Sequence, residues 1–186
     1  MERIMRDRNI LDNVCVEFCK TIDKYCRYIV VSGFVAISSG RTRGTEDIDV
    51  IVERIGKDKF GFLHRDLMKR KFNCMQGDDS NALYDDYLKE NLSIRYTYGN
   101  LPLPEVELKL AKDGLDKYQL KNRIKLKMTG LDVWFSTVDA NIAFKEELLK
   151  SDKDMEDAKH LRIVYANEID ENEINRIKEM VKRFRL

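Results

Sequence analysis

The chain has 186 residues, of which 43% are hydrophobic, so it is long enough for one domain with a core and too apolar for global disorder. Its 34 basic and 33 acidic side chains leave a formal net charge of +1, which neither favours nor excludes nucleic acid as a partner. No apolar run reaches the roughly 18 residues needed to span a bilayer. The charged start, 1–8, is unlike a secretion signal. We therefore expect a cytoplasmic protein with its cysteines as thiols.

Helical and strand patterns alternate along the first half of the chain. In order, they predict a helix over 9–28, a strand over 28–32, a helix over 34–39, a strand over 47–52 and a helix over 57–72. The polar stretch 73–92 predicts a loop with one irregular helix around 83–87. The next three strands are expected over 93–98, 105–110 and 124–135.

From residue 138 the apolar spacing is helical to the end of the chain. Asp170 is followed three positions later by Glu173, which is the pattern that opens a helix. The expected fold class is α+β, with a mixed sheet flanked by helices and a helical C-terminal third. We expect an α/β core over 1–137 and C-terminal helices over 138–186 that pack on it as one compact unit.

Two acidic residues interrupt the otherwise apolar strand predicted over 47–52. Alternate strand residues share a face, so Asp47 and Asp49 point the same way, roughly 7 Å apart at Cα. That spacing lets both carboxylates reach one hard divalent cation. A solvated edge strand is the alternative. The apolar remainder of the strand favours the metal, because like charges this close repel unless a cation neutralises them.

A turn of small residues precedes this acidic pair. Ser32 and Gly33 join the first predicted strand to a helix, and their backbone N–H groups would approach phosphate there. Arg41 and Arg43 follow, placed to neutralise further phosphate charge. We expect these four residues to bind a nucleotide.

This segment resembles the signature of the DNA polymerase beta superfamily of nucleotidyltransferases. The chain has Val31, Ser32 and Gly33, then thirteen intervening residues, then Asp47, Ile48 and Asp49, with serine where the superfamily usually has its first glycine. The resemblance implies the nucleotidyltransferase fold and a nucleoside triphosphate as substrate. It also implies a catalytic site in which the two aspartates bind Mg²⁺, with two ions possible.

Within that superfamily, the second half is similar to the AbiEii toxin-like type of small bacterial and archaeal proteins. Residues 141–145 (NIAFK) resemble the family's lysine-bearing helix, which makes Lys145 a nucleotide-binding candidate. Residues 153–157 (KDMED) resemble its Lys-Asp-x-x-Asp segment, so Lys153, Asp154 and Asp157 would position the substrate. A solvated salt bridge between residues 153 and 157 is the alternative. A toxin–antitoxin role with a cognate antitoxin, or a homo-oligomer, would fit this type.

The superfamily usually has a third carboxylate on a later strand. Glu107 and Asp132 are the candidates. We prefer Glu107 as the third catalytic and metal-binding residue, because its strand follows the aspartate pair sooner and has a wholly apolar opposite face.

Several functions remain open from the sequence. The acceptor of the nucleoside monophosphate is a tRNA, a protein or a small molecule. A catalytically inactive member of the fold, binding a nucleotide or a partner, is the main alternative. A third hypothesis is nucleic-acid binding through the basic segment 117–127, although an amphipathic structural segment explains it equally well. His64 and His160 have no partner at motif spacing, so we interpret both as non-catalytic.

Overall fold

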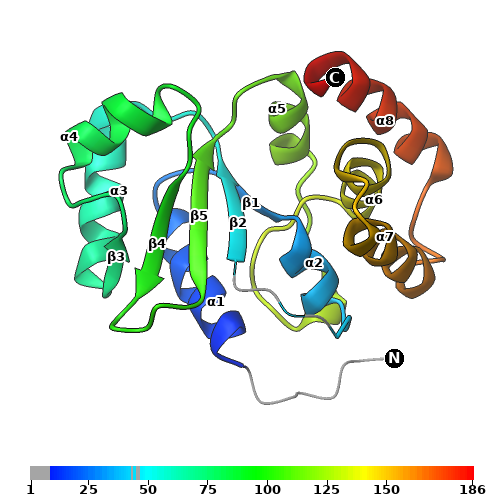
Figure 1. The fold of residues 1–186 in the computed structure, drawn as a ribbon, viewed down its shortest axis with the longest axis horizontal. Coiled ribbons are helices and arrows are strands. Elements are labelled where there is room, and N and C mark those ends of the chain that lie inside the picture. Colours follow the sequence, from blue (N-terminus) through cyan, green and yellow to red (C-terminus); the bar gives the residue numbers. More distant parts are fainter. Residues whose placement is uncertain (1–8, 43, 45–46) are drawn as a thin grey trace.

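A five-stranded mixed sheet forms the centre of the computed structural model, which describes residues 9–42, 44 and 47–186 (Figure 1). The spatial order is β1-β2-β5-β4-β3; β2 and β5 run parallel, and the other neighbours are antiparallel. The strands are β1 (Tyr28–Val31), β2 (Asp47–Val52), β3 (Phe72–Cys74), β4 (Ile94–Tyr98) and β5 (Glu105–Leu110). The sheet and its flanking helices confirm the expected α+β class.

The described part of the chain contains eight α-helices, of which the last three are grouped at one side of the molecule (Figure 1). They are α1 (Ile10–Ile22), α2 (Gly33–Ser38), α3 (Lys57–Lys69), α4 (Ser80–Leu83), α5 (Gly114–Lys121), α6 (Val138–Phe144), α7 (Asp152–Val164) and α8 (Glu171–Arg185). π-helical turns continue α4 over Tyr84–Leu88 and α6 over Lys145–Leu149. None of the helices in these described ranges is both long and apolar enough to cross a membrane.

The two faces of the sheet differ in character. One face is the main core, where Ile48, Val50 and Val52 of β2 are fully buried in the cluster that also contains α1. Phe18 of α1 packs against Phe72, with ring centroids 5.0 Å apart, which fixes that helix against the sheet. This burial explains why every second residue of β2 is aliphatic.

The opposite face is apolar at one end and polar at the other. Ile29 of β1, Ile51 of β2 and Leu120 of α5 form a small second cluster, so α5 covers the C-terminal end of β2. At the N-terminal end of β2, the same face presents Asp47 and Asp49. The sheet therefore holds the acidic pair beside, and not beneath, the covering helix.

The C-terminal helices pack on the rest of the chain at two places. α7 contacts α2, and α8 contacts α5 (Figure 1). At the second contact, Phe184 lies so close to Gly114 that a Cβ added to the glycine would be 2.9 Å from the ring. Arg185 binds Asp113 and Asp116 of the same region at 2.7 Å each. These contacts join residues that are about seventy positions apart in sequence.

Some predicted elements differ from the structure. The strand expected over 124–135 is wrong: only isolated bridges link Phe135 to Ile124 and Val30, and a 3₁₀ turn over Lys127–Thr129 ends at a left-handed Gly130. The first helix stops at Ile22, where the N–H groups of residues 25 and 26 turn back onto its carbonyl. β3 and α5 were not predicted, whereas the irregular helix near 83–87 and the C-terminal helices are confirmed.

Candidate active site

Four carboxylates occupy the polar face of two neighbouring strands. In the parallel pairing of β2 with β5, Asp49 lies opposite Glu107 and Asp47 lies opposite Glu105. Asp132, by contrast, has a side chain that is 77% exposed and binds Lys125. The register therefore brings Glu107, the preferred third acid, next to Asp49, and leaves Asp132 apart from them.

Two basic side chains contact this acidic group. Lys109 Nζ is 3.9 Å from Asp49 Oδ1 and 3.6 Å from Glu107 Oε1. Arg95 Nη2 lies 3.3 Å from Glu107 Oε2, and its Nη1 lies 3.5 Å from Glu105. Burial raises the pKa of Asp49, while the positive charge of Lys109 opposes that rise. Cationic side chains thus offset the repulsion that the sequence led us to expect.

Carboxylate oxygens are the donors that Mg²⁺ prefers, so Asp47, Asp49 and Glu107 fit this ion in chemical type. They are not gathered around one point, however. Within the described ranges, no group of three or more His, Cys, Asp or Glu side chains is arranged to hold a metal ion. Binding an ion between these strands would require the side chains, including Lys109, to rearrange.

The turn at Ser32 has an unusual backbone. Ser32 adopts φ 67° and ψ −140° directly before α2, and Gly33 is the first, buried residue of that helix. A positive φ is costly for a residue with a Cβ, which explains why a glycine would suit this position. The Ser32 side chain hydrogen-bonds with Asp49, and this bond partly opposes the rise that burial causes in the pKa of that carboxyl. The turn and the acidic strand are therefore directly connected.

We predict that Ser32→Gly is more stable than Ser32→Ala by about 1–2 kcal/mol, because both variants lose the hydroxyl and only glycine relieves the backbone strain. Urea denaturation of both variants measures the difference. The matched control is Ser39, where φ is −86° and glycine should bring no gain over alanine. A Ser32→Ala variant as stable as Ser32→Gly would show that the turn is unstrained.

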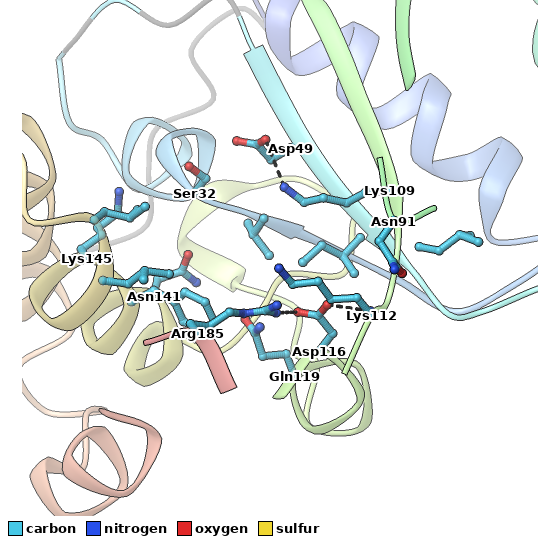
Figure 2. A pocket seen from close by; sticks show the side chains of 16 residues that line it. Ser32, Asp49, Asn91, Lys109, Lys112, Asp116, Gln119, Asn141, Lys145 and Arg185 are labelled. Atoms are coloured by element: carbon cyan, nitrogen blue, oxygen red, sulfur yellow. Dashed lines mark hydrogen bonds and ion pairs between the residues drawn. The ribbon is translucent and has the colours of Figure 1, made fainter. Parts of the chain in front are cut away.

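A cavity of about 380 Å³ opens beside these residues (Figure 2). Asp49, Ser32 and Lys109 lie toward one end of it, whereas Asp116 and Gln119 lie toward the other. Its apolar wall is formed by Val31, Ile51, Leu110, Phe144, Leu148 and Leu149. The cavity thus runs from the sheet to the C-terminal helices, with polar and charged residues at both ends and a largely aliphatic side.

The far end of the cavity holds polar residues that the sequence did not reveal. Arg185 binds Asp116 at 2.7 Å, which favours the charged carboxylate, while burial and the neighbouring Asp113 raise the pKa of Asp116 to about 7. Gln119 accepts a hydrogen bond from Ser136 at 2.7 Å. The Asp113 carboxylate caps α5 by accepting from the N–H of residues 115 and 116, and this capping pattern was the available signal for the helix.

Lys145 lines the cavity but is held within the C-terminal helices. Its side chain is 1% exposed, and its Nζ lies 2.9 Å from Asp157 Oδ2 and 3.2 Å from Asp154 Oδ1. Arg41 joins the same network, 2.5 Å from Asp157 and 2.7 Å from Glu156. The structure thus brings together Lys145, Asp154, Asp157 and Arg41, which were singled out separately.

Other candidates lie apart from the cavity. Lys153 is exposed on α7 and is not among the residues that line the cavity. Arg43 lies outside the described residues. His64 is buried in the core, where it hydrogen-bonds with the Tyr96 hydroxyl at 2.8 Å, and burial lowers its pKa. His160 contacts the Ser39 carbonyl. The nucleotide-binding and substrate-positioning roles expected from the resemblance remain predictions.

The basic segment 117–127 has some side chains that contact the rest of the protein, although its lysines are exposed. Tyr118 hydrogen-bonds to Glu173, and Arg123 stacks over Trp134 with its guanidinium carbon 4.5 Å from the ring centroid. Lys125 lies 4.9 Å from the same centroid. These contacts give Tyr118, Arg123 and Lys125 packing partners within the protein, and nucleic-acid binding by the segment stays a prediction.

No protein-family model matches the chain, and no curated protein matches it in sequence. Solved structures do match it in fold. One is an antigenic nucleotidyltransferase-like protein from Paracoccidioides brasiliensis, with a TM-score of 0.57 and 16% identity, covering 94% of this chain and 88% of that one. Another is the antibiotic-resistance factor ANT(2'')-Ia, with a TM-score of 0.51 and 11% identity, covering 92% and 93%. The chain therefore has the nucleotidyltransferase fold; at these identities the likeness concerns the fold alone.

Proposed function

We propose that this protein is a magnesium-dependent nucleotidyltransferase that moves a nucleoside monophosphate from a nucleoside triphosphate to an acceptor. The observation that carries the proposal is the pairing of Asp49 with Glu107 on adjacent parallel strands at one end of a cavity. The shared fold supports it. A volume of about 380 Å³ is within the usual range for small-ligand sites.

Each residue has a stated role in this proposal. Asp47, Asp49 and Glu107 would hold Mg²⁺, which supplies charge stabilisation at the triphosphate when bound. Glu107 would also accept the proton of the attacking acceptor hydroxyl. Attack on the α-phosphate then forms one P–O bond and breaks another, with pyrophosphate as the leaving group.

The surroundings of the cavity suit the rest of a nucleotide. The turn at Ser32 and Gly33 would offer backbone N–H groups to phosphate, and Lys145, which lines the cavity, would supply a positive charge. The aliphatic side and Phe144 offer a surface for a nucleobase. We further propose, from the resemblance in the second half of the chain, an AbiEii toxin-like subtype. Its acceptor would be a tRNA, a protein or a small molecule, and its partner a cognate antitoxin or a second copy.

A second candidate is a catalytically inactive member of the fold that binds a nucleotide or a partner. The contacts of Lys109 with both Asp49 and Glu107 favour it, because a side-chain ammonium already neutralises the carboxylates that a metal would need. Such a protein would bind a ligand in the cavity without catalysing nucleotidyl transfer.

The test is incubation of the protein with each α-labelled nucleoside triphosphate, Mg²⁺, and total RNA or total protein from the source cells. The proposal expects label to appear on one acceptor class and to vanish with a chelator. A rise in melting temperature with Mg²⁺ and triphosphate, without transfer to any acceptor, would support the inactive nucleotide-binding candidate instead.

We predict that Glu107→Gln lowers transfer by about 100-fold or more, because it removes both a metal ligand and a proton acceptor. Asp132→Asn is the matched change of an exposed carboxylate, bound to Lys125, and should leave transfer within about twofold. Initial rates of label transfer compare the two. A larger loss in Asp132→Asn would reverse our choice of the third acid.

A further inference from the structure

Lys109 occupies a particular place in the candidate site. It follows Glu107 by two positions on β5, so both side chains lie on the same face of the sheet. Its ammonium is within 4 Å of carboxylates on two strands, Asp49 of β2 and Glu107 of its own strand. The Lys109 side chain is 35% exposed, and it lines the cavity (Figure 2).

This contact differs from the other ion pairs along the cavity. Lys145 is bound by Asp154 and Asp157, and Arg185 is bound by Asp113 and Asp116; those four carboxylates lie outside the acidic group of β2 and β5. Lys112 lines the same cavity from an exposed position. Lys109 instead binds Asp49 and Glu107, two of the three carboxylates proposed to hold Mg²⁺.

We infer that Lys109 is a resident counter-ion that competes with the divalent cation for Asp49 and Glu107, and that it moves to the triphosphate when the cation binds. This inference rests on the proposed function. An ammonium and a metal ion cannot share the same carboxylate oxygens without strong repulsion. The metal therefore has to displace Lys109, whose flexible four-carbon stem lets the ammonium turn into the cavity.

The displaced ammonium gains a new partner in the cavity. A triphosphate that enters with its phosphates toward Asp49 brings several negative charges near the base of the Lys109 side chain. The lysine then acts as a point charge on phosphate. Lys109 thus lowers the affinity of the empty site for metal and raises its affinity for the triphosphate. Removing the lysine should therefore strengthen metal binding and weaken triphosphate binding.

The first experiment measures Mn²⁺ binding without nucleotide, by the loss of the electron paramagnetic resonance signal of the free ion. Lys109→Met should bind Mn²⁺ about two- to fivefold more tightly than the wild type, the range expected when a partly exposed ion pair is removed. Lys109→Arg retains the charge and should remain near the wild type. Lys112 also lines the cavity but is not paired with Asp49 or Glu107 in the ion pairs described above, so Lys112→Met should also leave the Mn²⁺ affinity unchanged.

The second experiment measures triphosphate binding by calorimetry at a Mn²⁺ concentration that saturates each variant, because Lys109 is displaced from the carboxylates only when the cation is bound. Lys109→Met should weaken it by about two- to fivefold, opposite in sign to its effect on Mn²⁺. Thermal melting confirms that each variant is folded, and Lys109→Gln replaces Lys109→Met if the latter is not. Equal or weaker Mn²⁺ binding by both charge-removing variants would overturn the inference and leave the proposed metal site standing. Failure of every variant to bind Mn²⁺ would overturn both.

Discussion

Asp49→Asn should reduce nucleotidyl transfer by about two to three orders of magnitude, the loss typical when one element of transition-state charge stabilisation is removed. The reason is its place in the site: Asp49 lies opposite Glu107, hydrogen-bonds with Ser32 and lines the cavity. The same variant should lose most of the rise in melting temperature that Mg²⁺ and a triphosphate give the wild type, because a ligand stabilises only the form that binds it.

The pKa of Asp49 also predicts the direction in which Asp49→Asn changes the free energy of unfolding without ligand. Burial raises the pKa of Asp49 above its ordinary value, so the ionised carboxylate reduces folding stability at pH values above that raised pKa. Asparagine carries no charge. Asp49→Asn should therefore be at least as stable as the wild type at pH 8, despite losing its contact with Lys109. Urea denaturation at pH 8 measures this.

These two readouts separate a functional role from a structural one. A variant that is stable but fails to respond to Mg²⁺ and triphosphate supports the metal-site proposal. Equal melting-temperature shifts in the wild type and Asp49→Asn would remove Asp49 from the site. Asp132→Asn, which does not line the cavity, should respond like the wild type.

The acidic strand was predictable because one face of β2 is buried. Burial of Ile48, Val50 and Val52 requires an alternating pattern, and that pattern fixes the direction of Asp47 and Asp49. The same argument applies to β5, where the fully buried aliphatic face set the direction of Glu107. What the pattern could not give is the register between the strands, because pairing is a long-range property.

The end of the cavity that Asp116 and Gln119 line was not predictable for a related reason. Arg185 and Asp116 are 69 positions apart, and their contact depends on how α8 packs on α5. The most conspicuous feature of the α5 sequence is its positive charge, which does not predict a helix. The feature that does predict one is Asp113, which caps the start of α5.

The prediction of a strand over 124–135 was wrong because the apolar residues of this segment are buried without forming a strand. Leu126, Leu131, Val133 and Phe135 are buried, but they fill the core from an irregular segment that turns at Gly130. Burial of alternate residues is necessary for a half-buried strand and is not sufficient for one. Residues 134 and 136 do hydrogen-bond to Val30 of β1, and Phe135 bonds to Ile124, but the pairing does not extend beyond these isolated bridges.

The buried network around Asp157 carries the largest stability effect that we expect. Asp157 is fully buried and contacts both Lys145 and Arg41, so it joins α7 to the end of α6 and to the segment after α2. Removing one partner of a buried ion pair leaves the other charge in a poorly solvated place. We predict that Lys145→Ala and Asp157→Ala each lower the free energy of unfolding by about 3–5 kcal/mol.

The matched control is Lys153→Ala, a lysine exposed on α7 near the same network. Its free energy of unfolding should change by less than about 0.5 kcal/mol. Denaturant unfolding of the three variants makes the comparison, and additivity offers a further check: Lys145→Ala combined with Asp157→Ala should cost less than the sum of the single changes, because the first change has already broken the shared contact.

This stability effect also determines how the nucleotide role of Lys145 has to be tested. If Lys145 contacts phosphate, Lys145→Ala should weaken triphosphate binding by about 1.5–3 kcal/mol, but an unfolded fraction would mimic that loss. Calorimetric titration should therefore be made at a temperature where melting curves show the variant folded, with Lys153→Ala beside it. A Lys145→Ala variant as stable as Lys153→Ala would mean that the ammonium is solvated, and the placement of α7 against α6 would then be wrong.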